Sequence, residues 1–218
     1  MLPLVVLGAI GAPHAVPKVA KMRTLSDGTS MPSVNLGTCC GSDPKVGLGP
    51  WLKEARPVMG SSPIGIDTAW DYHDESDIGA ILKSTAGLKR SDYYVTTKIP
   101  AGFGNATDCT ADPSVVTRYM KDNLAQLGLD HVDLALLHHP CTKGSRANPS
   151  GKDEPKIDAA LWQGLVQAQK AGMVKSIVSL ATVCVSPSPR VLLTQTLPAN
   201  RVYRTTRRPT SRASTGEA

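Results

Sequence analysis

Four side chains that could move a proton follow short apolar runs of the sequence. Asp67 ends the run PIGID with Tyr72 five residues beyond it, Lys98 ends DYYVTTK, and His138 lies near the end of VDLALLHH. A phenol, with an ordinary pKa of about 10, is a poor acid near neutrality, but an adjacent ammonium favours its phenolate and a carboxylate can hold that ammonium in place. An imidazole can orient a carbonyl oxygen or relay a proton. Together these residue types predict a proton donor for a carbonyl group.

Each of these side chains also has an ordinary structural explanation. An aspartate after a strand is commonly a cap, and a lysine there is commonly a surface charge. A lone histidine is most often a half-buried polar residue, and a tyrosine in a loop is often an anchor. Those explanations do not account for the same relative position of all four in successive units. Reduction of a carbonyl also needs a hydride, which no side chain supplies, so the chemistry requires a cofactor.

Apolar runs typical of buried strands alternate with helical stretches from Met22 onward. Residues 24–38 predict a strand, a turn at Asp27-Gly28 and a second extended run that ends at Gly37-Thr38. The further predicted strands cover residues 63–67, 92–98, 132–139 and 174–180, and the predicted helices cover residues 51–59, 75–88, 112–129 and 156–172. The clearest helix signals are Asp112 as N-cap, Pro113 at the first position and Gly128 as the stop. This order predicts a parallel sheet with right-handed helical crossovers.

Two architectures fit this alternation, an open doubly wound sheet and a (β/α)₈ barrel, and periodicity does not choose between them. Both place active sites at the carboxyl ends of the strands. Gly37-Thr38 ends the second extended run in the same way, so it joins the four proton-transfer side chains at the predicted rim.

Several segments of the sequence also resemble those of a known family. GIDTAWDYHDE is similar to the D-T-A-x-x-Y-x-N-E signature of the aldo-keto reductases, YVTTKIP to their strand-three lysine segment, and VDLALLHHP to their D-L-x-L-I-H-W-P segment. LVQAQKAGMVKSIVS resembles the helix and strand that follow, and LSDGTSMPSVNLGT the hairpin and first strand. The resemblance covers roughly residues 22–180. It implies an α/β fold of the (β/α)₈ TIM-barrel type, with about five β/α units present.

The resemblance also implies NADPH-dependent reduction of aldehydes or ketones. Tyr72 would be the general acid, Lys98 would favour loss of its proton, Asp67 would pair with Lys98, and His138 would orient the carbonyl. Further residues would bind rather than react: Gly37, Thr38 and Asp67 the cofactor, and Trp70, His138 and His139 the small-molecule carbonyl substrate.

The sequence departs from the family pattern in two places. Asp74 stands where the family more often has Asn, a mild difference, and Leu180-Ala181 stand where a nicotinamide-binding Ser-Asn pair is expected. Residues 181–218 are rich in Pro, Ser, Thr and Arg, a composition that predicts disorder in place of three more β/α units. Two hypotheses follow: a reductase with an incomplete cofactor site, or a non-catalytic truncated fragment that associates with another chain through an open sheet edge.

Charge and composition narrow the remaining possibilities. Residues 181–218 carry +5 of the net charge of +6, which favours a solvated basic tail over a nucleic-acid-binding surface. No apolar stretch reaches the roughly 20 residues of a membrane span. An odd number of Cys, five, without C-x-x-C spacing predicts buried free thiols and no metal site, with one or two disulfides only in a secreted chain.

The chain divides into three predicted parts: an apolar segment at residues 1–21, the reductase-like region at residues 22–180 and the divergent tail at residues 181–218. The resemblance implies a cytoplasmic protein. The first segment resembles a secretory signal without its basic start, so the secretory pathway is the alternative compartment.

Overall fold

The structure of the protein is a computed structural model, and it describes residues 21–178 except residues 26, 41 and 103–107. Five parallel strands form one sheet: β3 (Asn35–Gly37), β4 (Ile64–Asp67), β5 (Tyr93–Ile99), β6 (Val132–Leu137) and β7 (Val174–Val178). Their order in the sheet is their order in the chain. That order confirms the barrel type, because a doubly wound sheet reverses its strand order at a switch point.

Four helices connect these strands: α1 (Pro44–Met59), α2 (Glu75–Ser84), α3 (Ser114–Leu127) and α4 (Glu154–Lys170). Two short 3₁₀ turns, η1 (Trp70–Tyr72) and η2 (Arg90–Asp92), precede α2 and β5. An antiparallel hairpin of β1 (Met22–Thr24) and β2 (Ser30–Pro32) opens the described chain. Among the described residues, no helix combines the length and the apolar character that a membrane span requires.

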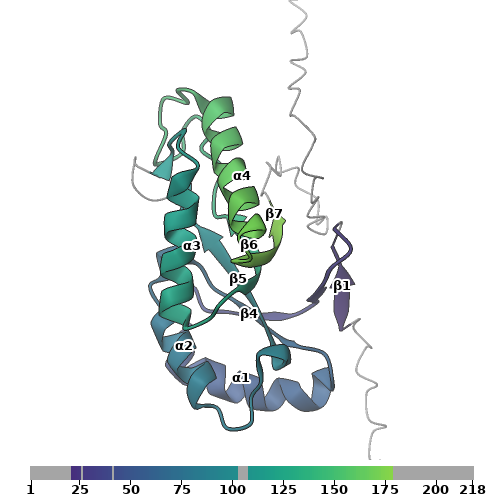
Figure 1. The fold of residues 1–218 in the computed structure, drawn as a ribbon. Helices are drawn as coiled ribbons and strands as arrows, with labels where there is room; N and C mark the ends of the chain where they lie inside the picture. Colours follow the sequence, from purple (N-terminus) through teal and green to yellow (C-terminus); the bar gives the residue numbers. More distant parts are fainter. Residues whose placement is uncertain (1–20, 26, 41, 103–107, 179–218) are drawn as a thin grey trace, which may run out of the picture.

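Each face of the sheet has its own apolar core. In β6, Ala135 and Leu137 pack with the helices, whereas Leu134 and Leu136 belong to a second cluster with Leu25 of the hairpin. Successive residues of a strand point to opposite faces, so a fully apolar strand such as β6 serves both cores. Figure 1 shows the result: the helices form an arc along one side of the sheet, and the hairpin lies on the other.

The predicted boundaries hold well for α3. The Asp112 carboxylate accepts a hydrogen bond from the Ser114 N–H at 2.9 Å, and Gly128 ends the helix with a φ of 64°. Gly128 acts as the sequence predicts, because glycine tolerates the left-handed conformation at a helix end. The start differs by one residue: Pro113 is the N-cap and the helix begins at Ser114, although the Asp112 carboxylate still satisfies the N–H of that first residue.

Two other predicted boundaries are wrong. Helix α1 begins at Pro44, seven residues before the predicted start, with the Asp43 carboxylate accepting from the Lys45 N–H at 2.8 Å. Its glycines and Pro50 resemble helix breakers, but Leu48 and Leu52 are buried four residues apart and anchor the first turns. The strand before the Asp27-Gly28 turn is present as β1, but the second predicted extended run, which ends at Gly37-Thr38, is divided: β2 pairs with β1 in the hairpin while β3 pairs with β4 in the main sheet.

A glycine allows α2 and α3 to approach closely. A Cβ atom at Gly79 would lie 2.5 Å from the carbonyl oxygen of Leu127, a contact that only a backbone shift could relieve. We expect Gly79→Ala to lower the free energy of unfolding by about 1–3 kcal/mol in urea titrations. Gly49→Ala in α1 is the matched control, because its Cβ would meet open space. This control should raise stability by about 0.5–1 kcal/mol, and equal effects of the two substitutions would contradict the close approach.

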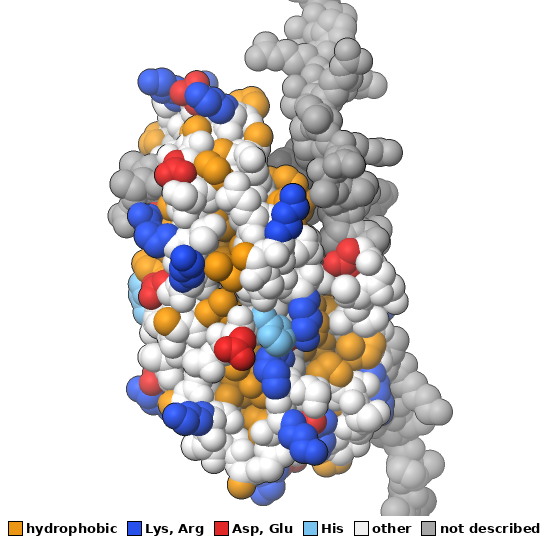
Figure 2. Space-filling model, in the orientation of Figure 1, with side chains coloured by type: hydrophobic (Ala, Val, Ile, Leu, Met, Phe, Trp, Pro, Cys, Tyr) orange, Lys and Arg blue, Asp and Glu red, His pale blue; other side chains and the backbone are white. Residues whose placement is uncertain are grey.

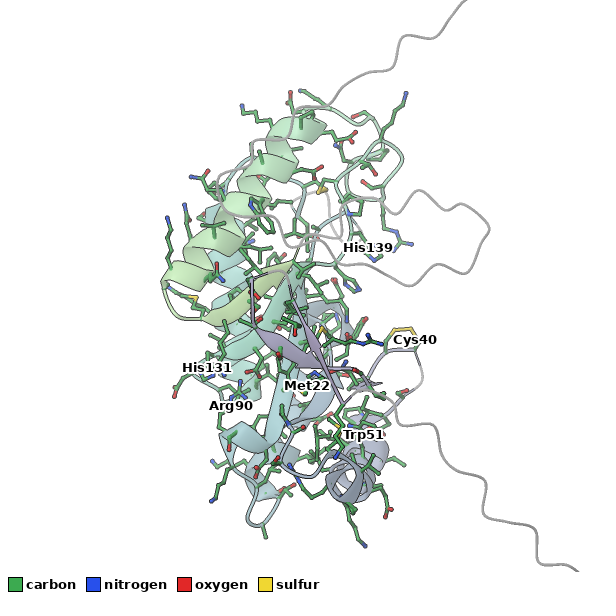
Figure 3. All side chains as sticks on the ribbon, turned by 90° about the vertical axis from the view of Figure 1, so that its right-hand side faces the viewer. Met22, Cys40, Trp51, Arg90, His131 and His139 are labelled. Carbon is green, nitrogen blue, oxygen red and sulfur yellow. A yellow bond between two sulfur atoms is a disulfide. The ribbon has the colours of Figure 1, made fainter. Side chains whose placement is uncertain are left out.

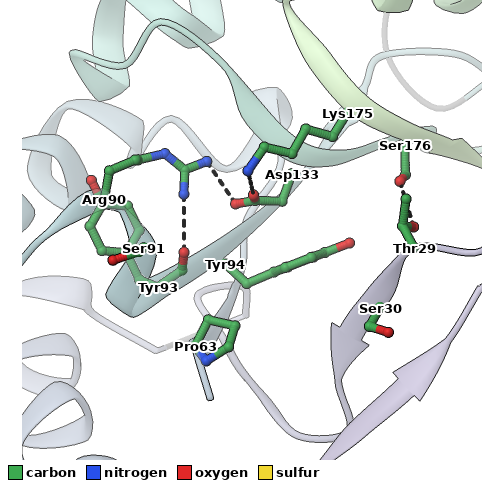
Figure 4. Close-up of a pocket in the computed structure, with 10 residues that line it drawn as sticks. All are labelled: Thr29, Ser30, Pro63, Arg90, Ser91, Tyr93, Tyr94, Asp133, Lys175 and Ser176. Carbon is green, nitrogen blue, oxygen red and sulfur yellow. Dashed lines mark hydrogen bonds and ion pairs between the residues drawn. The ribbon is translucent and has the colours of Figure 1, made fainter. Parts of the chain in front are cut away.

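Asp133 joins three elements at the amino-terminal end of the sheet. Its carboxylate, 4% exposed, accepts from Arg90 at 2.7 Å and from Lys175 at 2.9 Å. Figure 4 shows this cluster on one side of a pocket of about 300 Å³, with the hydroxyls of Thr29 and Ser176 in contact at 2.8 Å on the other side. These bonds tie β6, η2, β7 and the hairpin together at the end of the barrel remote from the strand termini that carry the predicted site.

The outer surface is mixed in character. Figure 2 shows acidic, basic and hydrophobic side chains interspersed over the face seen in Figure 1. On that face, the basic side chains of the described residues therefore do not merge into one continuous surface.

Candidate active site

Lys98 is the centre of a polar cluster at the carboxyl end of the sheet. Its Nζ forms an ion pair with Asp67 Oδ1, donates to the carbonyl oxygen of Thr68 at 2.9 Å and lies 3.3 Å from the hydroxyl of Tyr72. The Lys98 side chain is 13% exposed, so water screens this arrangement only weakly. The ammonium thus contacts both the carboxylate that balances its charge and the phenol that could lose a proton.

The turn η1 brings Tyr72 back toward the strands. Its N–H donates to the carbonyl oxygen of Ala69 at 2.9 Å, and His73 ends the turn in the left-handed conformation with a φ of 56°. Without this tight turn, five residues beyond the strand would carry the phenol away from β5. Local geometry therefore explains how Tyr72 reaches Lys98 from a loop.

His138 lies on the other side of the Tyr72 hydroxyl. Its N–H donates to the carbonyl oxygen of Ile99 at 2.9 Å, which continues the pairing of β5 and β6. Its Nε2 lies 3.5 Å from the Tyr72 oxygen, and the two rings meet edge to face at 72°. The phenol oxygen is thus placed between an ammonium and an imidazole.

His139 stacks on His138 with ring centroids 4.6 Å apart. Burial, and to a smaller degree the neighbouring His138, lowers the pKa of His139. The neutral imidazole of His139 is therefore favoured near pH 7.

Asp71 also contacts His138, although no sequence argument singled it out. Its Oδ2 lies 2.8 Å from His138 Nδ1, and the two side chains are 15% and 12% exposed. Asp71 precedes Tyr72 in η1, so a single turn places a carboxylate on one side of the imidazole and a phenol on the other.

Thr38 and Gly37 lie at the same end of the sheet. The Thr38 N–H and hydroxyl both approach the carbonyl oxygen of Asp67, at 3.1 and 3.4 Å, and Thr38 is 4% exposed. A Cβ atom at Gly37 would meet no atom within 4 Å, so the space beside the end of β3 is open. Figure 3 shows the two ends of the sheet from the hairpin side, with Cys40 and His139 on one side and Arg90 and His131 on the other.

Trp70 is the predicted site residue that the structure does not bring to the cluster. Its indole packs against Tyr119 of α3 at 4.8 Å, and its Nε1 donates to Asp122 at 2.5 Å. A 3₁₀ turn has three residues per turn, so Trp70 and Tyr72, two positions apart, point in different directions. The indole supports the packing of η1 on α3 rather than the rim.

The family comparison agrees with this geometry. A sequence model described as the aldo/keto reductase family matches residues 65–181, more than half of the chain. This chain belongs to the aldo-keto reductase family. The matched region contains Asp67, Tyr72, Lys98 and His138.

Curated aldo-keto reductases match most of the chain at moderate identity. Human aldo-keto reductase family 1 member C4 is 29% identical over 171 residues, which cover 74% of this chain and 50% of that protein. Methylglyoxal reductase DkgA of Escherichia coli K12 is 30% identical over 165 residues, covering 75% and 49%. An aldo-keto reductase of Mycobacterium sp. is 32% identical over 173 residues, covering 77% and 49%. The chain spans about half the length of these relatives.

Solved aldo-keto reductases share the fold. The silkworm (Bombyx mori) enzyme in complex with NADP is 29% identical with a TM-score of 0.53, and the match covers 73% of this chain and 50% of that one. An aldo-keto reductase complexed with NADPH is 27% identical with a TM-score of 0.52, covering 72% and 46%. These relatives support the TIM-barrel type that the strand order indicates.

The prediction for the cysteines of this aldo-keto reductase needs correction. Cys39 is bonded to Cys40, and Cys109 to Cys141, whereas free thiols were the expectation. Cys109 follows β5 and Cys141 follows β6, so a cross-link between them joins the loops behind Lys98 and His138. Spacing along the sequence could not show this pairing, because 32 residues separate the two positions.

Peptide mapping would test these bonds. Without reduction, we expect trypsin to release residues 99–118 linked to residues 122–143 through Cys109 and Cys141. The peptide of residues 24–45 should be two hydrogens lighter than after reduction, because Cys39 and Cys40 would share a bond. The reduced sample is the control. Alkylation of Cys109 and Cys141 in unreduced protein would contradict the cross-link.

The predictions for residues 1–20 and 179–218 lie outside the described residues. They include the apolar first segment, the Leu180-Ala181 departure and the basic tail.

Proposed function

We propose that this chain is an NADPH-dependent oxidoreductase that reduces the carbonyl group of aldehydes or ketones to an alcohol. The observation that carries the proposal is the position of the Tyr72 hydroxyl, 3.3 Å from Lys98 Nζ and 3.5 Å from His138 Nε2. A phenol between an ammonium and an imidazole can give its proton to an oxygen that is gaining negative charge.

The residues at the rim fit the nicotinamide end of the cofactor. Thr38 is fixed against the end of β4, Gly37 leaves open space beside it, and the Asp67 side chain is 36% exposed at the same rim. Gly37, Thr38 and Asp67 would hold this end of NADPH. When bound, the cofactor supplies the hydride that the carbonyl carbon receives.

The protein's own residues then handle the proton. Tyr72 donates its hydroxyl proton to the carbonyl oxygen as that oxygen becomes an alkoxide, and the product is the neutral alcohol. Lys98 stabilises the phenolate left on Tyr72, and its ion pair with Asp67 keeps the ammonium in place. His138, together with His139 stacked on it, would orient the carbonyl oxygen toward the phenol.

The proposal is tested by two measurements on the full chain. We expect NADPH to change the tryptophan fluorescence of the protein in a saturable way. We also expect an aromatic aldehyde such as benzaldehyde to cause consumption of NADPH, followed by its near-ultraviolet absorbance, with one alcohol formed per NADPH. Absence of binding at millimolar NADPH would overturn the proposal.

A second candidate role follows from the edges of the sheet. Among the described strands, β3 and β7 each pair on one side only. An edge strand presents unpaired N–H and C=O groups that another chain can extend. We therefore propose self-association through such an edge as the alternative. Light scattering after size exclusion would show a dimer or larger species, and a well-folded monomer at micromolar concentration would contradict this alternative.

A further inference from the structure

Asp71 and Tyr72 contact opposite nitrogens of the same imidazole. Asp71 Oδ2 lies 2.8 Å from His138 Nδ1, and the Tyr72 oxygen lies 3.5 Å from Nε2. Because the side chains of Asp71 and His138 are 15% and 12% exposed, the carboxylate–imidazole contact is largely shielded from water.

This aspartate is a feature of the chain itself rather than of the family pattern. In D-T-A-x-x-Y, the two positions before the tyrosine are unspecified, and here they are Trp70 and Asp71. The structure uses them differently: the indole packs on α3, and the carboxylate turns toward β6.

Hydrogen-bond chemistry determines which nitrogen carries the proton. An ionised carboxylate can only accept, so a contact of 2.8 Å requires the proton to be on Nδ1. In the neutral ring Nε2 is then a bare acceptor, and it faces the Tyr72 hydroxyl. Nε2 can donate toward a carbonyl oxygen only when it also carries a proton.

We propose that Asp71 is a positioning residue that holds His138 in the Nδ1–H tautomer and fixes the plane of its ring. The catalytic consequence rests on the proposed function, whereas the tautomer itself does not. The donor ability of His138 toward a carbonyl oxygen then depends on whether Nε2 carries a second proton.

Other groups also lie close to the imidazole of His138. Tyr72 approaches from η1, His139 stacks on the ring at 4.6 Å, and Lys98 from β5 reaches the Tyr72 oxygen at 3.3 Å. Of these groups and Asp71, only Asp71 contacts Nδ1 of His138 in the described part of the chain, at 2.8 Å.

The tautomer can be observed directly by nitrogen NMR of protein with ¹⁵N-labelled histidine, with His138→Gln to assign the signals. In the wild-type protein at alkaline pH we expect Nδ1 to carry the proton and Nε2 to have the shift of a bare nitrogen. Asp71→Asn should shift the population toward Nε2–H, as the same exchange does to the triad histidine of serine proteases.

Asp77→Asn on α2 is the matched control. It makes the same chemical change at a carboxylate that pairs with Lys45 rather than with the imidazole, so the His138 signals should not change. A wild-type spectrum with the proton on Nε2 would overturn the proposal, whether or not any variant folds. If the spectrum shows the proton on Nδ1 but the chain neither binds nor consumes NADPH, the positioning role of Asp71 stands. The proposed function is then rejected.

Discussion

Replacing Tyr72 with Phe is expected to lower kcat for NADPH-dependent reduction of an aromatic aldehyde by about 10²–10⁴-fold. The substitution removes a single oxygen, the one that lies between Lys98 Nζ and His138 Nε2. The ring and its packing remain, so binding of NADPH should change little. Steady-state kinetics and a fluorescence titration of the cofactor would measure the two effects separately.

Tyr94→Phe is the matched control for this substitution. Tyr94 is 6% exposed, and its hydroxyl has no hydrogen-bond partner among the described residues. It lines the pocket at the other end of the sheet, beside Asp133 (Figure 4). We expect kcat to stay within about twofold of the wild-type value, since this residue is remote from the reacting atoms. Equal losses in both variants would show that Tyr72→Phe acts through the fold and not as a proton donor.

Replacing Glu75 with Gln is expected to stabilise the protein by about 3 kcal/mol near pH 8. Glu75 is fully buried in the first turn of α2, and neither carboxylate oxygen has a hydrogen-bond partner among the described residues. Burial raises the pKa of this carboxyl from its ordinary 4.5 to about 7; the backbone N–H of Glu75 opposes that rise, and the charges of Asp74 and Asp122 add to it by smaller amounts. Each pKa unit corresponds to about 1.4 kcal/mol, which gives the expected magnitude.

The sign of the effect follows from proton binding. Between about pH 4.5 and 7 the folded protein holds a proton on Glu75 that the unfolded chain releases, so stability falls as the pH rises through this window. Glutamine is neutral at every pH in this range. The increase in the free energy of unfolding on Glu75→Gln should therefore be less than about 0.5 kcal/mol near pH 4.5 and largest near pH 8. Urea unfolding at the two pH values would measure this difference. Glu54→Gln, at an exposed position of α1, should show no such pH dependence, and the same profile in both variants would contradict the argument.

The residues at the carboxyl end of the sheet could be predicted from the sequence because they occupy the same position in successive β/α units. In every unit a buried strand ends and a polar side chain follows, and parallel strands bring those ends together at one edge. Asp67, Lys98 and His138 obey that relationship directly. The position of Tyr72 depends in addition on a turn tight enough to return the chain to the strands.

The residues that the sequence did not reveal depend on side-chain direction or on distant pairing. Trp70 and Asp71 occupy adjacent positions, and only the rotation of η1 decides that the carboxylate meets His138 while the indole meets α3. Glu75 follows the same turn as an ordinary first-turn acidic residue of a helix, a position that favours negative charge at the surface. Its complete burial becomes visible only when α2 is packed.

The hairpin has a consequence for the order in which the protein is made. The hydroxyl of Thr29 meets that of Ser176, 147 positions further along the chain. A ribosome adds about 5–20 residues per second, so the hairpin waits about 7–30 s for this partner to be synthesised. Leu25 lacks its partners Leu134 and Leu136 until β6 is synthesised, and it lacks Val178 of β7 until the end of that interval. A nascent chain that has not yet reached β6 therefore leaves this apolar side uncovered. Translation speed and chaperone supply should therefore affect the yield of folded protein.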